Sequence, residues 1–201
     1  MNDDFRADVR RCIDSDQAPR TLRQVFAENY GLHALLAYRL GRTLQRSQCK
    51  LWWWPMLPLA WLLYYLLSRY VRVAFDIRLE LSADIGPGLY IGHFGGLRVR
   101  GCRIGANCSI GRLTEIAPAA SGSGPVIGER VWIGGHVRIV GAYQIGSDTT
   151  VSAGAVVQRD IPERSLCMGN PARIVMRNYD NRSILGLTEI AQPAKSALRP
   201  G

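Results

Sequence analysis

Histidine is the side chain that most readily exchanges a proton near neutral pH, and the chain contains three of them. His93 lies in the stretch IGHFGG, where Gly95 and Gly96 keep the adjoining backbone bare and leave room for a substrate to approach. His33 lies in a segment with helical spacing and is expected to be structural. His136 is expected to be a surface residue, with a place near a substrate groove as the alternative.

The spacing of His, Cys and carboxylates, the cysteine count and the net charge exclude several classes of protein. No spacing of His, Cys and carboxylates matches a metal site, so no metal is expected. The five cysteines are odd in number, form no CxxC pair and follow no secretory leader, which indicates reduced thiols in a cytoplasm. The formal charge of +9, from 25 basic and 16 acidic residues, is spread along the chain. It favours an anionic small ligand or an anionic membrane surface over nucleic acid.

The N-terminal part of the chain has helical spacing. Apolar residues recur at steps of three and four over residues 21–45, which predicts an amphipathic helix with a possible weakness at Gly31. Residues 51–67 then form an uncharged run, LWWWPMLPLAWLLYYLL. As one helix this run would reach about 25 Å, short of the roughly 30 Å hydrocarbon core, so a membrane span is the least favoured interpretation. An apolar helix that packs between subunits and a segment lying in the membrane surface both stay open.

The strongest pattern begins at Ile85, where an aliphatic residue recurs at a step of six. The step has one extra residue before Ile104 and a longer excursion between Ile116 and Ile127. Glycine occupies the following position seven times, where a corner needs a small or permissive residue. The twelve aliphatic positions are 85, 91, 97, 104, 110, 116, 127, 133, 139, 145, 151 and 157.

A six-residue unit with one inward aliphatic is a short strand plus a turn, and three units close a triangular coil. Positions eighteen residues apart are then expected to stack, placing Ile127 on Ile145, Ile133 on Val151 and Ile139 on Val157. The N-terminal helices are expected to cap one end of the coils, and the stretch after residue 161 the other.

These repeats resemble the hexapeptide-repeat acyltransferases, especially serine acetyltransferase and its relatives in polysaccharide gene clusters. The resemblance covers residues 76–175, with IGPGLYIGHFGG at 85–96, IGERVWIGGHVRI at 127–139, IGSDTTVSAGAVV at 145–157 and MGNPARIV at 168–175. It implies a β fold, a left-handed parallel β-helix preceded by an α-helical segment, and a homotrimer or a dimer of trimers. The implied domains are 1–75, which includes the hydrophobic segment 51–67, then 76–177, and a tail, 178–201.

The resemblance also implies roles for individual residues. His93 aligns with the family's catalytic histidine, the general base that takes a proton from an alcohol as it attacks the thioester of acetyl-CoA. Backbone that lines the pantetheine arm of the acyl carrier falls at Gly135 and Ala153, with Gly154 beside them. Arg159 and Arg173 are candidates for its phosphates, since guanidinium groups pair well with phosphate oxygens, and solvated surface charges are the alternative.

Three positions depart from the serine acetyltransferase pattern. The acidic residue that orients the family's histidine falls at Arg78, so Asp76 or Glu80, two residues to either side on the same strand face, is expected to replace it. The residue before the histidine is Gly92 instead of Asp. A second histidine, which contacts the amino-acid acceptor in the family, falls at Gly124.

These departures lead us to expect an O-acetyltransferase that transfers the acetyl group of acetyl-CoA to a sugar hydroxyl in polysaccharide or glycan synthesis. The enzyme would be cytoplasmic, and a peripheral association with the inner membrane stays open. Serine O-acetyltransferase is the alternative acceptor class, and a non-catalytic trimeric scaffold is the alternative from another class of protein.

Overall fold

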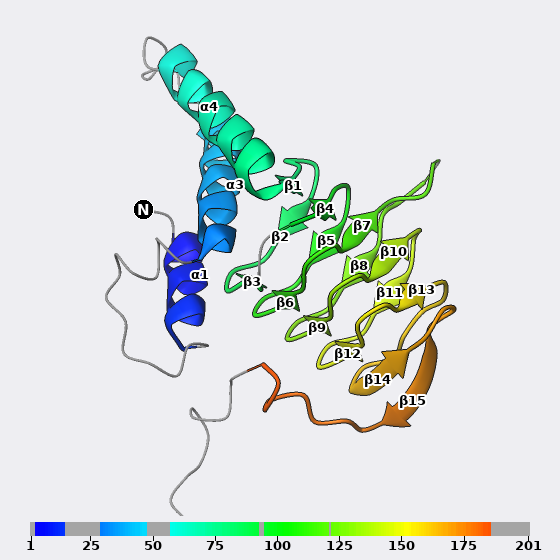
Figure 1. Ribbon diagram of the computed structural model, residues 1–201. Coiled ribbons are helices and arrows are strands. Elements are labelled where there is room, and N and C mark those ends of the chain that lie inside the picture. The colour runs from blue at the N-terminus through cyan, green and yellow to red at the C-terminus, as the bar shows by residue number, and fades with distance from the viewer. Residues whose placement is uncertain (1–2, 15–28, 48–56, 93–94, 121, 186–201) are drawn as a thin grey trace, which may run out of the picture.

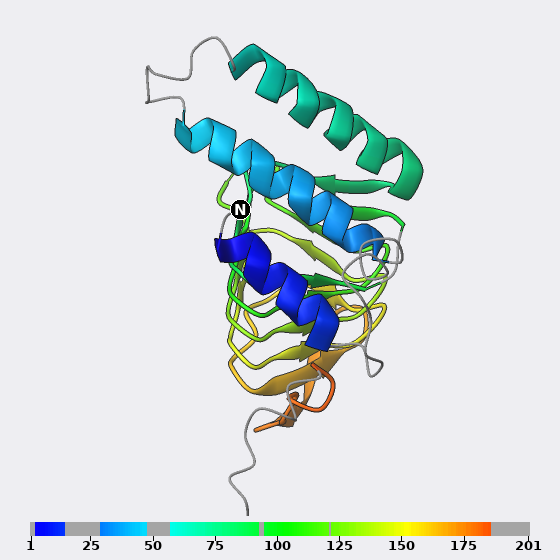
Figure 2. The same ribbon diagram turned by 90° about the vertical axis from the view of Figure 1, so that its left-hand side faces the viewer.

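The computed structural model describes residues 3–14, 29–47, 57–92, 95–120 and 122–185. Three helices precede a parallel β-solenoid: α1 (Asp3–Asp14), α3 (Tyr30–Ser47) and α4 (Leu57–Phe75). The helices lie side by side in that order at the end of the solenoid where the first coil begins (Figures 1 and 2). The predicted left-handed parallel β-helix preceded by a helical segment is confirmed.

Three parallel sheets form the sides of the solenoid, and each coil adds one strand to each sheet. The first sheet consists of β1 (Ile77–Leu79), β4 (Leu97–Val99), β7 (Glu115–Ala117), β10 (Arg138–Val140) and β13 (Val156–Val157). The second consists of β2 (Asp84–Ile85), β5 (Arg103–Ile104), β8 (Val126–Ile127) and β11 (Gln144–Ile145). The third consists of β3 (Tyr90–Ile91), β6 (Ser109–Ile110), β9 (Trp132–Ile133), β12 (Thr150–Val151), β14 (Ser165–Met168) and the antiparallel β15 (Arg173–Arg177).

The predicted aliphatic positions form the core. Each of the twelve side chains is at most 4% exposed. Strand pairing puts Ile145 beside Ile127, Val151 beside Ile133 and Val157 beside Ile139, so the predicted stacking is confirmed. Each coil therefore buries its aliphatic side chains against the coils above and below it, which supplies most of the driving force for folding.

The glycine after an aliphatic position is required by the distance between successive coils. A Cβ atom on Gly134 would lie 2.5 Å from the backbone nitrogen of Ala153, and one on Gly111 would lie 2.5 Å from that of Gly135. Neither glycine has a positive φ. The sequence pattern therefore reflects the close approach of neighbouring backbones, and no left-handed conformation is needed at these positions.

The helical segment covers the N-terminal end of the coils. Gly31 lets α3 approach β3, because a Cβ atom there would lie 2.7 Å from the Cβ of Ile91. A second connection, which no sequence pattern indicated, joins the fully buried Asp8 on α1 to the nearly buried Arg39 on α3. The Arg39 guanidinium donates to the Asp8 carboxylate at 3.0 and 3.3 Å and to the carbonyl of Ile85 at 2.7 Å. This pair fixes two helices to the second sheet.

The helix bounds differ from those expected. The described part of the helix predicted over residues 21–45 is α3, which ends at Ser47, and residues 21–28 lie outside the described part of the chain. The apolar run 51–67 is described from residue 57, where α4 begins, and that helix continues to Phe75. Pro58 lies in its first turn, where a missing N–H costs no hydrogen bond. None of the described helices is both long and apolar enough to cross a membrane.

Cys102, Cys108 and Cys167 carry free, buried thiols, and Cys12 is also buried. Burial raises the pKa of the Cys102 thiol to about 12 and that of Cys167 to about 11. These thiols are therefore packing residues rather than nucleophiles. The fifth, Cys49, lies outside the described residues.

Candidate functional site

The site predicted from the sequence lies at the corner where each coil passes from the third sheet to the first. We call it the glycine corner. Its described members come from four successive coils and have little or no side chain at most positions. They are Gly92, Gly95, Gly96, Arg112, Leu113, Gly135, His136, Ala153 and Gly154.

Backbone hydrogen bonds connect the coils along this corner. The N–H of Leu113 donates to the carbonyl of Gly95 at 2.9 Å, and the N–H of Gly154 donates to that of Gly135 at 2.9 Å. Leu113 and His136 have φ values of 53° and 59°, in the left-handed region, as does Gly154 at 73°. The corner is thus a regular ladder whose repeated turn gives the same backbone direction in every coil.

The surface of this ladder is open to solvent. A Cβ atom added to Gly95 or to Gly154 would meet no atom of the described residues within 4 Å, and Ala153 is exposed. Less space is available at Gly135, where an added Cβ atom would lie 3.3 Å from the carbonyl oxygen of Arg112. The glycine corner therefore offers accessible backbone at Gly95, Ala153 and Gly154, between the exposed side chains of Arg112, Leu113 and His136, where an extended ligand arm can approach.

His93 lies outside the described residues, between Gly92 and Gly95 of the glycine corner. Asp76 immediately precedes β1, and Ile77 pairs with Leu97 on β4, so Asp76 lies at the strand end where Gly96 lies. The Asp76 carboxylate is half exposed, 3.5 Å from the guanidinium of Arg78. Asp76 is thus the described carboxylate near the residues that flank His93.

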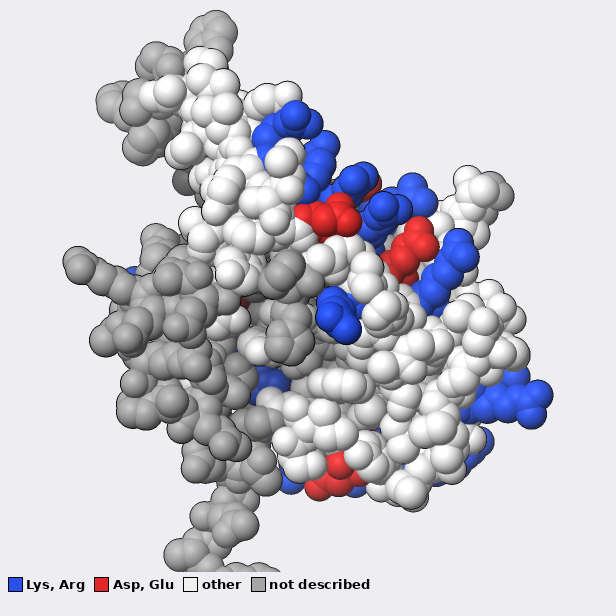
Figure 3. Space-filling model, in the orientation of Figure 1, with Lys and Arg blue, Asp and Glu red and all other residues white. Residues whose placement is uncertain are grey.

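Glu80 lies at the opposite end of the same strand. Its N–H donates to the carbonyl of Val99 at 3.0 Å, and its carboxylate accepts a hydrogen bond from Ser82 at 3.2 Å. Glu80 also lines a hollow of about 200 Å³ on the outer face of the first sheet, together with Arg78, Arg98, Val99, Arg100 and Glu115. Basic and acidic side chains alternate over this face of the molecule (Figure 3). The structure therefore separates the two predicted carboxylates.

The two predicted phosphate-binding arginines also lie apart. The N–H of Val156 donates to the carbonyl of Gly169, and the N–H of Ala172 donates to the carbonyl of Val156. These bonds hold the loop before β15 against the start of β13, so Arg173 emerges near the lower end of the glycine corner. Arg159 follows the other end of β13 and is exposed at the next corner. Gly135, Ala153 and Arg173 thus lie on one side of the solenoid, and Arg159 on another.

Arg112 at the glycine corner was not predicted from the sequence. It follows Ile110 by two residues, the same offset that separates His93 from Ile91 and Gly135 from Ile133. Its side chain is exposed. The repeat frame contained this signal, because residues at one offset from the aliphatic position occupy one corner. The same frame puts His136 at the glycine corner, exposed, beside the predicted groove.

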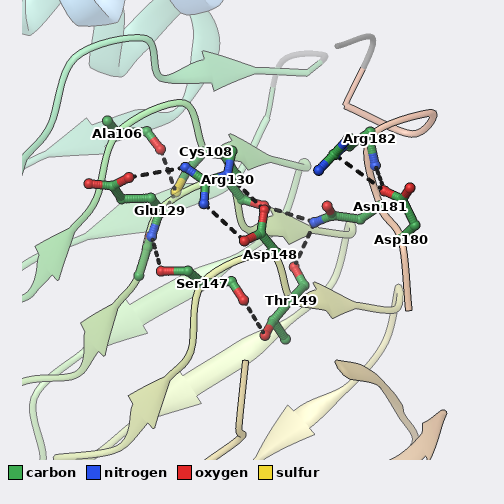
Figure 4. Close-up of polar contacts among 11 residues, drawn as sticks. Ala106, Cys108, Glu129, Arg130, Ser147, Asp148, Thr149, Asp180, Asn181 and Arg182 are labelled. Atoms are coloured by element: carbon green, nitrogen blue, oxygen red, sulfur yellow. Dashed lines mark hydrogen bonds and ion pairs between the residues drawn. The ribbon is translucent and has the colours of Figure 1, made fainter. Parts of the chain in front are cut away.

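A different corner, where the second sheet passes to the third, is closed by polar side chains. We call it the Arg130 corner, and it includes Ala106, Glu129, Arg130, Ser147, Asp148 and Thr149 (Figure 4). The Arg130 guanidinium donates two hydrogen bonds to the Asp148 carboxylate, at 2.7 and 2.9 Å. The Arg130 hydrogen bonds lower the pKa of Asp148. Asn181, from the segment after β15, is buried there and donates to the carbonyl of Arg130 at 2.8 Å.

No family model matches the sequence. A serine acetyltransferase of Helicobacter pylori is 28% identical over 182 residues, which is 87% of this chain and 98% of the relative. The crystal structure of the Neisseria gonorrhoeae serine acetyltransferase in complex with serine is 26% identical, with a TM-score of 0.72, over 87% of this chain and 68% of that one. The Brucella abortus serine acetyltransferase in complex with coenzyme A is also 26% identical, with a TM-score of 0.72, over 86% and 66%.

The expectation of a sugar hydroxyl as the acceptor is wrong, because the relatives and the structural neighbours are serine acetyltransferases. The missing second histidine was one of the departures that led to that expectation. A Cβ atom on Gly124 would run into the carbonyl oxygen of Gly101, so no side chain fits at this point of the loop. The absence of that histidine reflects how the excursion packs on the preceding coil, and it does not identify an acceptor.

Proposed function

We propose that this chain, a hexapeptide-repeat acyltransferase similar to the serine acetyltransferases, transfers the acetyl group of acetyl-CoA to the hydroxyl of L-serine. One observation carries the proposal. The accessible backbone of the glycine corner runs from the residues that flank His93 to the loop before β15, on a fold whose neighbours were solved with coenzyme A and with serine.

His93 acts as the general base in this proposal. Its neutral imidazole takes the proton of the serine hydroxyl while the oxygen bonds to the thioester carbonyl carbon. The negative charge that develops on the carbonyl oxygen is stabilised by hydrogen-bond donors. When the carbon–sulfur bond breaks, the imidazolium returns the proton to the thiolate, which leaves as coenzyme A. The products are O-acetylserine and the free thiol, and no metal takes part.

The chain's own residues supply binding and orientation. The backbone at Gly135, Ala153 and Gly154 lines the pantetheine arm, and Arg173 pairs with phosphate at the lower end of the glycine corner. Arg159, at the next corner, reaches the same nucleotide only from a greater distance. The position of Asp76 beside Gly96 supports Asp76 as the residue that orients His93.

Glu80, at the far end of β1, is the second candidate for that role. Its position is better suited to neutralising the positive charge on the outer face of the first sheet, since Glu80 lines the same hollow as Arg78, Arg98 and Arg100. Replacing each carboxylate by its amide separates the two roles. Asp76→Asn would shift the pH dependence of turnover, whereas Glu80→Gln would not.

The proposal extends to assembly, location and domains. Residues 76–177 form the acyltransferase domain, 1–75 the helical region and 178–201 the tail. The chain assembles into a homotrimer or a dimer of trimers, which the native mass measured by light scattering tests. The free thiols suit the reducing cytoplasm.

The test is the release of thiol from acetyl-CoA with purified full-length chain. Saturable release that depends on L-serine is expected, together with a higher melting temperature in coenzyme A, because a ligand that binds the native state stabilises it. Thiol release with other hydroxyl compounds and none with L-serine would overturn the acceptor assignment. If neither acetyl-CoA nor coenzyme A raised the melting temperature, the enzymatic proposal would be overturned and a non-catalytic scaffold would be favoured.

A further inference from the structure

The outer face of α4 carries a continuous apolar stripe that faces solvent. Its residues recur at helical steps of three and four, so they share one face of the helix. Their side chains are between 50% and 74% exposed, whereas the aliphatic residues of the solenoid core are at most 4% exposed. Isolated exposed apolar residues are common, but a contiguous stripe marks an interaction surface. The α4 stripe consists of Leu59, Leu62, Leu63, Leu66, Tyr70 and Val73.

The charge around the α4 stripe has one sign. Residues 29–75 contain six Lys and Arg but no Asp or Glu. Arg39 and Arg42 of this range pair with Asp8 and Asp84, which lie outside it. Arg69 and Arg72, on α4 itself, are exposed and form no ion pair with any residue that the structure describes. Helical spacing puts Arg69 at the edge of the stripe, whereas Arg72 lines a hollow between α3, α4 and β1, together with Arg78 and Glu80. The apolar surface is therefore flanked by positive charge at Arg69.

The position of α4 makes its stripe accessible to a flat surface. Figures 1 and 2 show α4 on the side of α3 opposite α1, with one end leading into β1 and the other end projecting beyond the coils. In Figure 3 the described part of the projecting end shows no charged side chain on this face, and basic side chains lie at the base of the helix. A helix of 19 residues is about 28 Å long, and none of the described helices is able to span a bilayer. The helix suits an orientation in the plane of a membrane surface.

The same observations weigh against a second copy of the chain as the occupant. Two α4 stripes packed together would bring Arg69 of both copies to one interface, and no acidic residue of 29–75 would compensate this charge. Anionic lipid headgroups supply the missing opposite charge. The exposed Tyr65 and Tyr70 also suit the boundary between lipid and water, where amphipathic rings are favoured.

We propose that the α4 stripe binds the surface of an anionic lipid bilayer, with the leucines inserted among the acyl chains and Arg69 at the headgroups. This interaction holds the solenoid at the membrane without spanning it. It is independent of the acyl transfer proposed above, because α4 contributes no residue to the glycine corner.

The experiment is co-sedimentation of the full-length chain with vesicles of phosphatidylcholine alone and with vesicles that also contain phosphatidylglycerol. Binding to the anionic vesicles is expected, and it weakens with salt, because the Debye length falls from about 10 Å at 0.1 M to about 3 Å at 1 M. The double variant Leu62→Glu/Leu66→Glu is expected to lower binding at least about tenfold, since it places carboxylates in the inserted face.

The matched control is Val126→Glu/Ile184→Glu, which adds the same charge at exposed apolar residues outside the helices and is expected to bind within about twofold of the unchanged chain. Arg69→Gln is expected to weaken the preference for anionic vesicles, whereas Arg103→Gln retains it. Equal loss in the control pair, or binding that ignores lipid charge, would overturn the proposal. So would a halved native mass in Leu62→Glu/Leu66→Glu with unchanged vesicle binding, which would assign the stripe to a second copy.

Discussion

The glycine corner and the Arg130 corner share one backbone ladder between successive coils but differ in the side chains that cover it. At the Arg130 corner, side chains from successive coils bond to one another, and Asn181 covers the corner from outside. At the glycine corner, Gly95 and Gly154 face open space among the described residues. A repeat needs only one way to turn a corner. The contrast therefore indicates that one corner is used for stability and the other is kept accessible for a ligand.

The largest effect is expected from His93→Ala. Removal of a general base lowers turnover by about 10²- to 10⁴-fold, while the native mass and melting temperature stay unchanged. Thiol release at saturating acetyl-CoA measures the loss. His33→Gln, a change in α3 away from the glycine corner, is the control and is expected to keep its turnover. If His93→Ala kept more than about a tenth of the turnover of the unchanged chain, His93 would not be the general base. The assignment of the glycine corner as the active site would then be contradicted.

The next largest effect is expected when the same larger side chain is placed at each of the two corners. Ala153 and Ala106 both follow an aliphatic position by two residues, one at the glycine corner and one at the Arg130 corner. Ala153→Leu covers the accessible backbone and is expected to raise the KM for acetyl-CoA about tenfold, equivalent to about 1.4 kcal/mol of lost binding. Ala106→Leu makes the same change at the other corner and is expected to leave this KM unaltered. Equal effects of both variants would contradict the assignment.

Asn181→Ala tests the opposite corner. The Asn181 amide donates to the buried carbonyls of Arg130 and Thr149, and its loss leaves these groups without that partner. A decrease of about 1–3 kcal/mol in the free energy of unfolding is expected, measured by urea denaturation. The KM for acetyl-CoA should not change. A raised KM with unchanged stability would assign the Arg130 corner to ligand binding.

The smallest effect is a pH dependence. The Arg130 hydrogen bonds hold the pKa of Asp148 below its ordinary value of 3.8. A carboxyl whose folded-state pKa is lowered stabilises the fold above its unfolded pKa, and this contribution is lost as the pH falls through the folded value. The melting temperature of Asp148→Asn should therefore differ most from that of the unchanged chain near neutrality and converge with it in acid. A constant difference across this range would show that the ion pair contributes nothing that titrates.

Much of the fold was predictable because the repeat is local. One aliphatic residue every six positions specifies a strand and a corner, and stacking follows when three units close a coil. The site was predictable to the same extent: the frame puts Gly135 and Ala153 at one corner and contained the signal for Arg112. The acceptor was not predictable, since a missing histidine at Gly124 reports only the packing of a loop on Gly101.

The sequence by itself determined the coil, its core and the corner that carries Gly135 and Ala153, because these depend on residues a fixed distance apart in the chain. Only the tertiary structure decided which carboxylate lies beside Gly96, that Asp8 on α1 pairs with Arg39 on α3, and that the leucines of α4 face outward. Each of these depends on how segments far apart in the chain meet, and no period in the sequence encodes that.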